Sequence, residues 1–165
     1  MSRRMAMVMV ALAAALAGVA AAVPAAAATQ VVRIADVDVR TFATASLADQ
    51  FVRMQPRQVT DLQRWSIDSN LPTTGSRVVN VATKGCLGVS PTIPIVEGSP
   101  VTQHPCRNHS SDLWRLVMNS TDRTVRFVNV YSGLCMTIPP SSAAPLLRTY
   151  RCAGTVSQQF RLVTT

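Results

Sequence analysis

The sequence predicts an all-β domain with threefold internal repetition, on the strength of three observations. Residues 79–116 and 128–162 each open with Val-Asn-Val, carry a cysteine six residues after the Asn, and place an aromatic residue eight positions after a second cysteine. A third copy without cysteines precedes them. The runs between turn residues are short, and none is a convincing long helix. Three such units predict a closed or capped β architecture.

The first 28 residues have the composition of an export signal. Two arginines precede an uncharged apolar run over residues 5–23, and Pro24 and a string of alanines follow. This pattern predicts cleavage near Thr29 and a secreted protein with no membrane span after cleavage. The alternative is a retained anchor, because residues 5–28 are long enough to cross a bilayer.

The remaining chain, 165 residues less 28 or 137, is the size of one domain. It carries 14 basic and 8 acidic residues, a formal charge of +6, and Lys84 is its only lysine. The arginines are scattered singly, which favours a solvated basic surface over a specific nucleic-acid site.

All four cysteines lie in this part of the chain. An even number in an exported protein predicts two disulfides. The only histidines are His104 and His109, without an HxxxH or CxxC pattern, so no metal site or cofactor is expected.

The first repeat, about residues 29–70, contains three candidate strands. Alternation predicts a strand over residues 37–42, and short apolar runs predict strands over 51–54 and 64–67. Residues 44–54 also have apolar side chains at helical spacing, so a helical turn there is the alternative. A turn over residues 70–75 ends the repeat.

The second and third repeats, about residues 76–118 and 123–165, follow one plan, and the single domain spans 29–165. Together the three repeats predict about twelve short strands; the candidates in the second and third lie at 77–83, 84–89, 101–106, 113–118, 123–132, 133–138, 146–152 and 160–163.

One aromatic residue closes each repeat. Trp65, Trp114 and Phe160 are separated by 49 and 46 residues, and a polar residue stands two positions before each: Gln63, Asp112 and Gln158. Residues two apart on a strand face the same way. We therefore expect a shared threefold aromatic core, with each polar side chain bonding nearby backbone.

These landmarks resemble those of ricin-type β-trefoil lectin domains, whose repeats carry Cys-Leu-Asp-Val, Pro-Cys and Gln-x-Trp motifs. The corresponding segments are CLGV, HPC and DLW in the second repeat, CMTI, RC and QQF in the third, and QPR and QRW in the first. The resemblance implies a β-trefoil with disulfides Cys86–Cys106 and Cys135–Cys152, each stabilising by about 3 kcal/mol. The segments CLG and SGLC are also similar to accessory trefoil subunits of cytolethal distending toxins.

In that family an Asp two residues after the first cysteine and an aromatic two before the second bind the sugar, with polar neighbours. The resemblance therefore implies a set of candidate carbohydrate-binding residues here: Tyr150, Arg148, Thr137, Ser157, His104, Thr102, Asp112 and Asp38. Gly88 and Thr137 stand where the family has its Asp, so no repeat keeps a complete site.

Tyr150 is the strongest of these candidates, because a phenol can stack on a sugar ring and also donate a hydrogen bond. Arg148 should point to the same side and would suit an acidic or sulfated ligand. The alternative is that Tyr150 only covers the barrel and Arg148 is solvated. In the first repeat, aligning Asp36 with Cys86 makes Asp38 the candidate acid and places Gln55 at the aromatic position. A register shifted by two residues selects Asp36 instead.

The residues do not predict an enzyme, since no nucleophile elbow or suitably placed pair of carboxylates is found. We expect a secreted, non-catalytic protein that binds glycans or cell-surface carbohydrate. The alternative is an interaction or delivery subunit that has lost sugar binding and works with a partner toxin or enzyme subunit.

Overall fold

A computed structural model describes residues 29–68, 75–90, 94–140 and 143–165. The expected export signal and most of the turn expected at 70–75 lie outside these ranges. The described chain contains twelve strands, four in each repeat: β1 (Gln30–Asp36), β2 (Thr41–Thr44), β3 (Arg53–Pro56), β4 (Trp65–Asp68), β5 (Ser76–Asn80), β6 (Cys86–Val89), β7 (Val101–His104), β8 (Leu113–Asn119), β9 (Thr124–Asn129), β10 (Cys135–Thr137), β11 (Arg148–Tyr150) and β12 (Phe160–Thr164).

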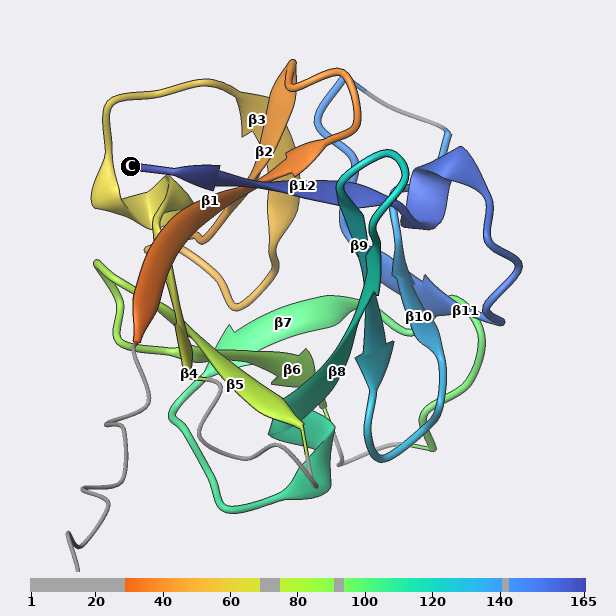
Figure 1. Ribbon diagram of the computed structural model, residues 1–165. Coiled ribbons are helices and arrows are strands. Elements are labelled where there is room, and N and C mark those ends of the chain that lie inside the picture. The colour runs from red at the N-terminus through yellow and green to blue at the C-terminus, as the bar shows by residue number, and fades with distance from the viewer. Residues whose placement is uncertain (1–28, 69–74, 91–93, 141–142) are drawn as a thin grey trace, which may run out of the picture.

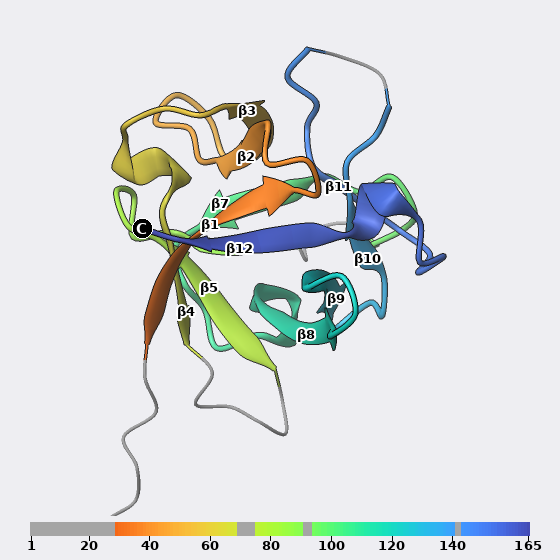
Figure 2. The same cartoon turned by 45° about the horizontal axis from the view of Figure 1, so that its top comes forward.

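Six of these strands close into a barrel. Each strand in the order β1, β4, β5, β8, β9, β12 pairs antiparallel with the next, and β12 pairs again with β1 (Figure 1). The other six form three hairpins, β2–β3, β6–β7 and β10–β11. Figure 2 shows the β2–β3 hairpin on one side of β1 and β12, with β4, β5 and β8 on the other. This is the predicted β-trefoil, and in the described ranges no helix is long and apolar enough to span a membrane.

The three hairpins are joined by a ring of backbone hydrogen bonds. Val52 N donates to Val101 O (3.3 Å), Val101 N to Leu147 O (2.8 Å), and Leu147 N to Val52 O (2.9 Å). All three side chains are fully buried. Because each repeat supplies one residue, no repeat can complete this junction alone.

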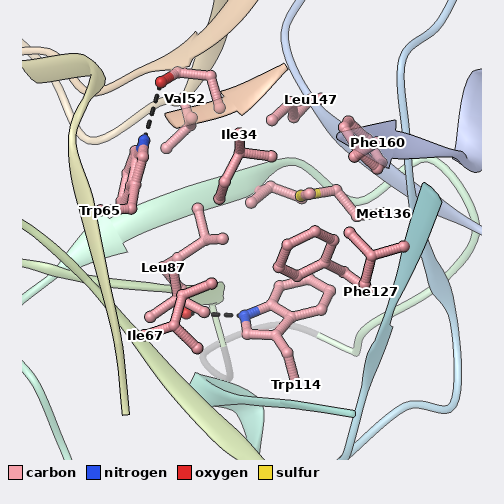
Figure 3. Packing of buried hydrophobic residues seen from close by; sticks show 14 of the residues in the cluster. Ile34, Val52, Trp65, Ile67, Leu87, Trp114, Phe127, Met136, Leu147 and Phe160 are labelled. Atoms are coloured by element: carbon pink, nitrogen blue, oxygen red, sulfur yellow. Dashed lines mark hydrogen bonds between the residues drawn. The ribbon is translucent and has the colours of Figure 1, made fainter. Parts of the chain in front are cut away.

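The aromatic core predicted from the repeat spacing is confirmed. Trp65, Trp114 and Phe160 have no exposed surface and belong to one cluster (Figure 3). Trp65 Nε1 donates to Ala43 O and Trp114 Nε1 to Leu87 O, both at 2.9 Å, so both buried indole N–H groups are satisfied.

A single turn of 3₁₀ helix precedes each core aromatic, a feature that the sequence pattern did not predict. The turns are η1 (Asp61–Gln63), η2 (Ser110–Asp112) and η3 (Val156–Gln158). Each ends on a buried polar residue: Gln63, Asp112 and Gln158. Gln63 Oε1 accepts from Gln58 N, Asp112 Oδ2 from Arg107 N and Gln158 Oε1 from Ala153 N, so these side chains bond nearby backbone as expected.

Both disulfides implied by the family resemblance are present. Cys86 is bonded to Cys106 and Cys135 to Cys152. Each bond ties the first strand of a hairpin to the segment that follows its second strand.

In the first repeat one expectation was wrong and one alternative is excluded. Residues 37–40 form a turn rather than a strand, because the Asp36 carboxylate accepts bonds from Arg40 N and from the backbone and hydroxyl of Thr41. Residues 44–54 contain no helical turn: Ser46 Oγ accepts from Ala48 N and Asp49 N and bends the chain into β3.

Candidate functional site

Strand register defines three equivalent positions, one on each hairpin. Gln55 lies opposite Phe42, His104 opposite Cys86, and Tyr150 opposite Cys135. The residues two positions further along the first strands are Thr44, Gly88 and Thr137. The register expected for the first repeat was therefore wrong, because Thr44 and neither Asp36 nor Asp38 occupies the place of Gly88. Asp38 lies on an exposed turn, 3.9 Å from Arg40.

In the second repeat, the protein fills this position with its own side chains. Asp112 is fully buried, and its Oδ1 lies 3.3 Å from His104 Nε2, 3.4 Å from an Arg107 nitrogen and 3.1 Å from Ser111 Oγ. Arg107 also lies 3.0 Å from His104 Nε2. His104 and Asp112 thus meet in a cluster of the protein's own side chains.

The absence of a side chain at Gly88 makes this cluster possible. A Cβ there would lie 2.9 Å from His104 Nε2 and 3.1 Å from Asp112 Oδ1. Thr102 is 1% exposed and its hydroxyl donates to Gly88 O at 3.5 Å. The second repeat therefore presents little polar surface to a sugar at this point.

The third repeat brings four of the predicted residues together. Thr137 pairs with Arg148 across the hairpin, Tyr150 lies two residues further on the same face, and Ser157 O accepts from Ile138 N at 2.8 Å. The Thr137 hydroxyl is already engaged, donating to Cys135 O and accepting from Gln158 Nε2. Tyr150 is half-buried, so part of this residue is open to solvent.

Arg148 is held in place by the second repeat. One of its nitrogens donates to Gly98 O at 2.6 Å, and the neighbouring Arg151 pairs with Glu97 at 2.5 Å. The Tyr150 hydroxyl oxygen lies 3.7 Å from the position that a Cβ atom added to Gly98 would occupy. The site therefore lies beside the loop that joins the two strands of the preceding hairpin.

The first repeat has an open cavity of about 470 Å³ at the equivalent position. Its walls include Thr44, Arg53, Gln55 and Gln58, with no aromatic ring. Arg53 forms a two-pronged pair with Asp49, at 2.9 and 2.8 Å. This hydrogen bonding lowers the pKa of Asp49 from 3.8 to about 2, so the carboxylate stays ionised.

A second cavity of about 620 Å³ lies between the first and second repeats. The loop at residues 47–50 forms one wall, and Lys84, Gln103 and His104 lie on the other. Gln103 is held there by Thr83 Oγ1 and by the carbonyl of Ser46. The 47–49 loop lines both this cavity and the first-repeat cavity.

One serine, two histidines and an aspartate meet in the second repeat without forming a catalytic triad. Ser111 Oγ lies 2.9 Å from His109 Nδ1 and 3.1 Å from Asp112 Oδ1, so the carboxylate contacts the serine rather than His109. Ser111 also has no exposed surface. A nucleophile must reach its substrate, and this hydroxyl cannot. Within the described ranges, no group of three metal-ligating side chains is found either.

The sequence did not identify Arg53, Gln58 or the Asp49–Arg53 ion pair as features of the first repeat, nor Arg107 as a feature of the second. The spacing of 49 residues between Trp65 and Trp114 aligns Arg53 with Thr102, and this alignment would have identified Arg53 as a candidate. Arg107 carried no comparable signal, because its role depends on the buried charge of Asp112.

Comparison with known proteins agrees with this architecture. The designed threefold-symmetric protein ThreeFoil superimposes with a TM-score of 0.73 at 20% identity, over 82% of this chain and 99% of that one. A ricin B-like lectin from Macrolepiota procera, solved with lactose, gives 0.69 at 11% identity over 82% and 96%. The cytolethal distending toxin of Haemophilus ducreyi gives 0.68 at 14% identity over 82% and 83%.

At these identities the similarity shows the fold alone, and no curated protein sequence matches the chain. The sequence pattern described as ricin-type beta-trefoil lectin domain-like matches residues 61–145, from the first 3₁₀ turn into the third repeat. The chain belongs to the ricin-type β-trefoil lectin-like family.

Proposed function

We propose that this protein is a secreted, non-catalytic carbohydrate-binding protein whose main sugar site is on the third repeat. The half-buried Tyr150, opposite Cys135 on the third hairpin, is the observation that carries the proposal. Tyr150 is equivalent to His104 of the second repeat, which is turned inward, and to Gln55 of the first repeat, which has no ring. A flat apolar face next to hydroxyl and guanidinium groups suits a pyranose, which has one apolar face and a rim of hydroxyls.

The site favours sugars with an acidic or sulfated substituent. Arg148 already donates to Gly98 O, and its remaining N–H groups can bind a carboxylate or sulfate next to the ring stacked on Tyr150. The first-repeat cavity, with its two amides, is a second and more polar contact for the same class of ligand.

A glycan array with the purified protein and a matched pair of tyrosine variants tests this function. Tyr150→Ala should weaken binding by about tenfold, the value of one stacking contact. Tyr131→Ala is the control, because Tyr131 is the only other tyrosine and lies 58% exposed on the β9–β10 turn. Binding that is absent, or equal in the two variants, contradicts the proposal.

Export is tested separately by mass spectrometry of protein recovered from the culture medium. A chain that begins within a few residues of Thr29 supports the cleaved signal. A chain that keeps residues 1–28 and sediments with membranes supports the anchor instead.

A second candidate is a delivery or interaction subunit without sugar binding. The filled second-repeat position favours it, since that hairpin keeps the fold while closing the site. Stable co-purification of a second protein with the native chain, combined with an empty glycan array, would support this role.

A further inference from the structure

Arginines encircle the barrel at a single level. Five of the six barrel strands carry one arginine next to a fully or almost fully buried core residue, so alternation directs the arginine outward. We call these five residues the arginine belt: Arg33 on β1, Arg77 on β5, Arg115 on β8, Arg126 on β9 and Arg161 on β12. Ser66 holds the corresponding position on β4.

Strand register shows that the belt is continuous. Arg77 pairs with Leu113, two residues before Arg115. Arg115 pairs with Val128, two residues after Arg126. Each belt arginine is thus a diagonal neighbour of the next, with Cα atoms roughly 7–8 Å apart.

The same step of two residues closes the belt. Val125 pairs with Phe160, and this register places Arg126 diagonal to Arg161. Ala35 pairs with Arg161, and this register places Arg33 diagonal to Arg161. Ser66 pairs with Val79, two residues after Arg77, and completes the ring. The barrel strands in Figure 1 can be followed in this order, β5, β8, β9, β12 and β1.

Positive charge exceeds negative charge along the belt. Asp68 lies directly opposite Arg77, and Asp122 is close enough to Arg161 for the arginine to help lower its pKa, after the larger effect of the Thr124 hydroxyl. Asp61 also lines a cavity with Arg33, where it is paired with Arg64, so three carboxylates lie near the five belt guanidinium groups. Five arginines outside the belt each have a carboxylate within 4 Å: Arg40, Arg53, Arg64, Arg107 and Arg151.

We propose that the arginine belt binds an anionic polysaccharide along the barrel wall, at a surface separate from the Tyr150 site. Guanidinium groups bind sulfate and carboxylate through two parallel hydrogen bonds, and their even spacing suits a chain with repeated charges. The outward residues between the arginines are aliphatic, such as Val79, Val117 and Val163. No aromatic side chain of the barrel strands faces outward to stack on bases, so the belt favours a polysaccharide over single-stranded nucleic acid.

Binding to heparin oligosaccharide, dextran sulfate and polygalacturonate at several salt concentrations tests the belt. The Arg115→Gln/Arg126→Gln variant should bind about tenfold more weakly and show a salt slope reduced by about two charges. The control Arg40→Gln/Arg57→Gln removes the same charge from exposed positions outside the belt and should change the affinity less than about twofold. Binding of dextran sulfate or of polygalacturonate then identifies sulfate or carboxylate as the group recognised.

Three results would overturn the proposal that the belt binds a polysaccharide. They are an equal loss of affinity in both double variants, no binding to any of the polyanions, or equally tight binding of an oligo-dT strand. If the double variant is unstable, Arg115→Glu alone serves, since the Arg115 side chain is exposed. Neutral glycans are measured in parallel and should be unaffected by the belt variants. Failure of the Tyr150 site and failure of the belt are therefore distinguishable.

Discussion

At the scale of single residues, the three hairpins differ because a few side chains at equivalent positions have different hydrogen-bonding needs. Gln63 and Gln158 each present an amide N–H to a threonine, Thr44 or Thr137. Asp112 has no donor and requires donors around it. Arg107 and Ser111 supply them, His104 Nε2 lies 3.3 Å away, and this cluster fills the second-repeat position.

Gly88→Ala tests the closed cluster. The new Cβ would lie 2.9 Å from His104 Nε2 and 3.0 Å from the backbone oxygen of Ser111, so we expect a loss of about 1–3 kcal/mol in the free energy of unfolding. Urea denaturation measures it. Adding His104→Ala should recover only part of the loss, since the Ser111 contact remains; full stability in the single variant would contradict the packing described.

The Asp49–Arg53 pair predicts a pH dependence. Because the pKa of Asp49 is lowered to about 2, the ionised pair stabilises the fold above the ordinary pKa of 3.8, and this contribution is lost as the pH falls through about 2. The Tm of Asp49→Asn should therefore lie below that of the wild type at pH 6, and the two should converge between pH 4 and about 2. The difference should be small because the pair is near the surface. If the difference in Tm between the two proteins stayed constant down to pH 2, the Asp49–Arg53 pair would not be its cause.

At the scale of elements, each disulfide fastens a hairpin that has little secondary structure of its own. Strands β10 and β11 have three residues each, and Cys152 anchors the segment after Tyr150 back to β10. The first hairpin has Phe42 in place of the first cysteine and relies on buried packing instead.

Removing one disulfide should therefore cost stability without abolishing the fold. The bridges span 20 and 17 residues, and loop entropy gives about 3 kcal/mol for either. Cys135→Ser/Cys152→Ser should also weaken glycan binding, whereas Cys86→Ser/Cys106→Ser should spare it. Equal glycan affinity in both variants, measured on folded protein, would contradict the placement of the site on the third hairpin.

At the scale of the whole molecule, the three repeats share one core and one junction. The ring through Val52, Val101 and Leu147 and the aromatic cluster each need a contribution from every repeat. We therefore expect a single cooperative unfolding transition.

Leu147→Ala tests this coupling. Its side chain is fully buried, and the cavity should cost about 2–5 kcal/mol. Both tryptophans lie in the first two repeats, yet tryptophan fluorescence should report the same shifted midpoint as circular dichroism. Val156→Ala, at a 64% exposed position of the same repeat, should change stability by less than about 0.5 kcal/mol. Separate midpoints for the two probes would show that the repeats unfold independently.

The sequence by itself determined the all-β class, the repeat spacing, the three core aromatics and, through the family resemblance, the disulfide pairing. The first three follow from periodicity and spacing, which are local properties of a chain, and the pairing follows from the resemblance. Only the tertiary structure decided the register of the first repeat, the closure of the second-repeat position and the alignment of the arginine belt. Asp36 bonds its own turn, Asp112 accepts from Arg107 and Ser111, and the arginines meet only because the barrel closes. The first two depend on side-chain hydrogen bonds and the third on contacts between strands distant in sequence, and local alternation carries no signal for either.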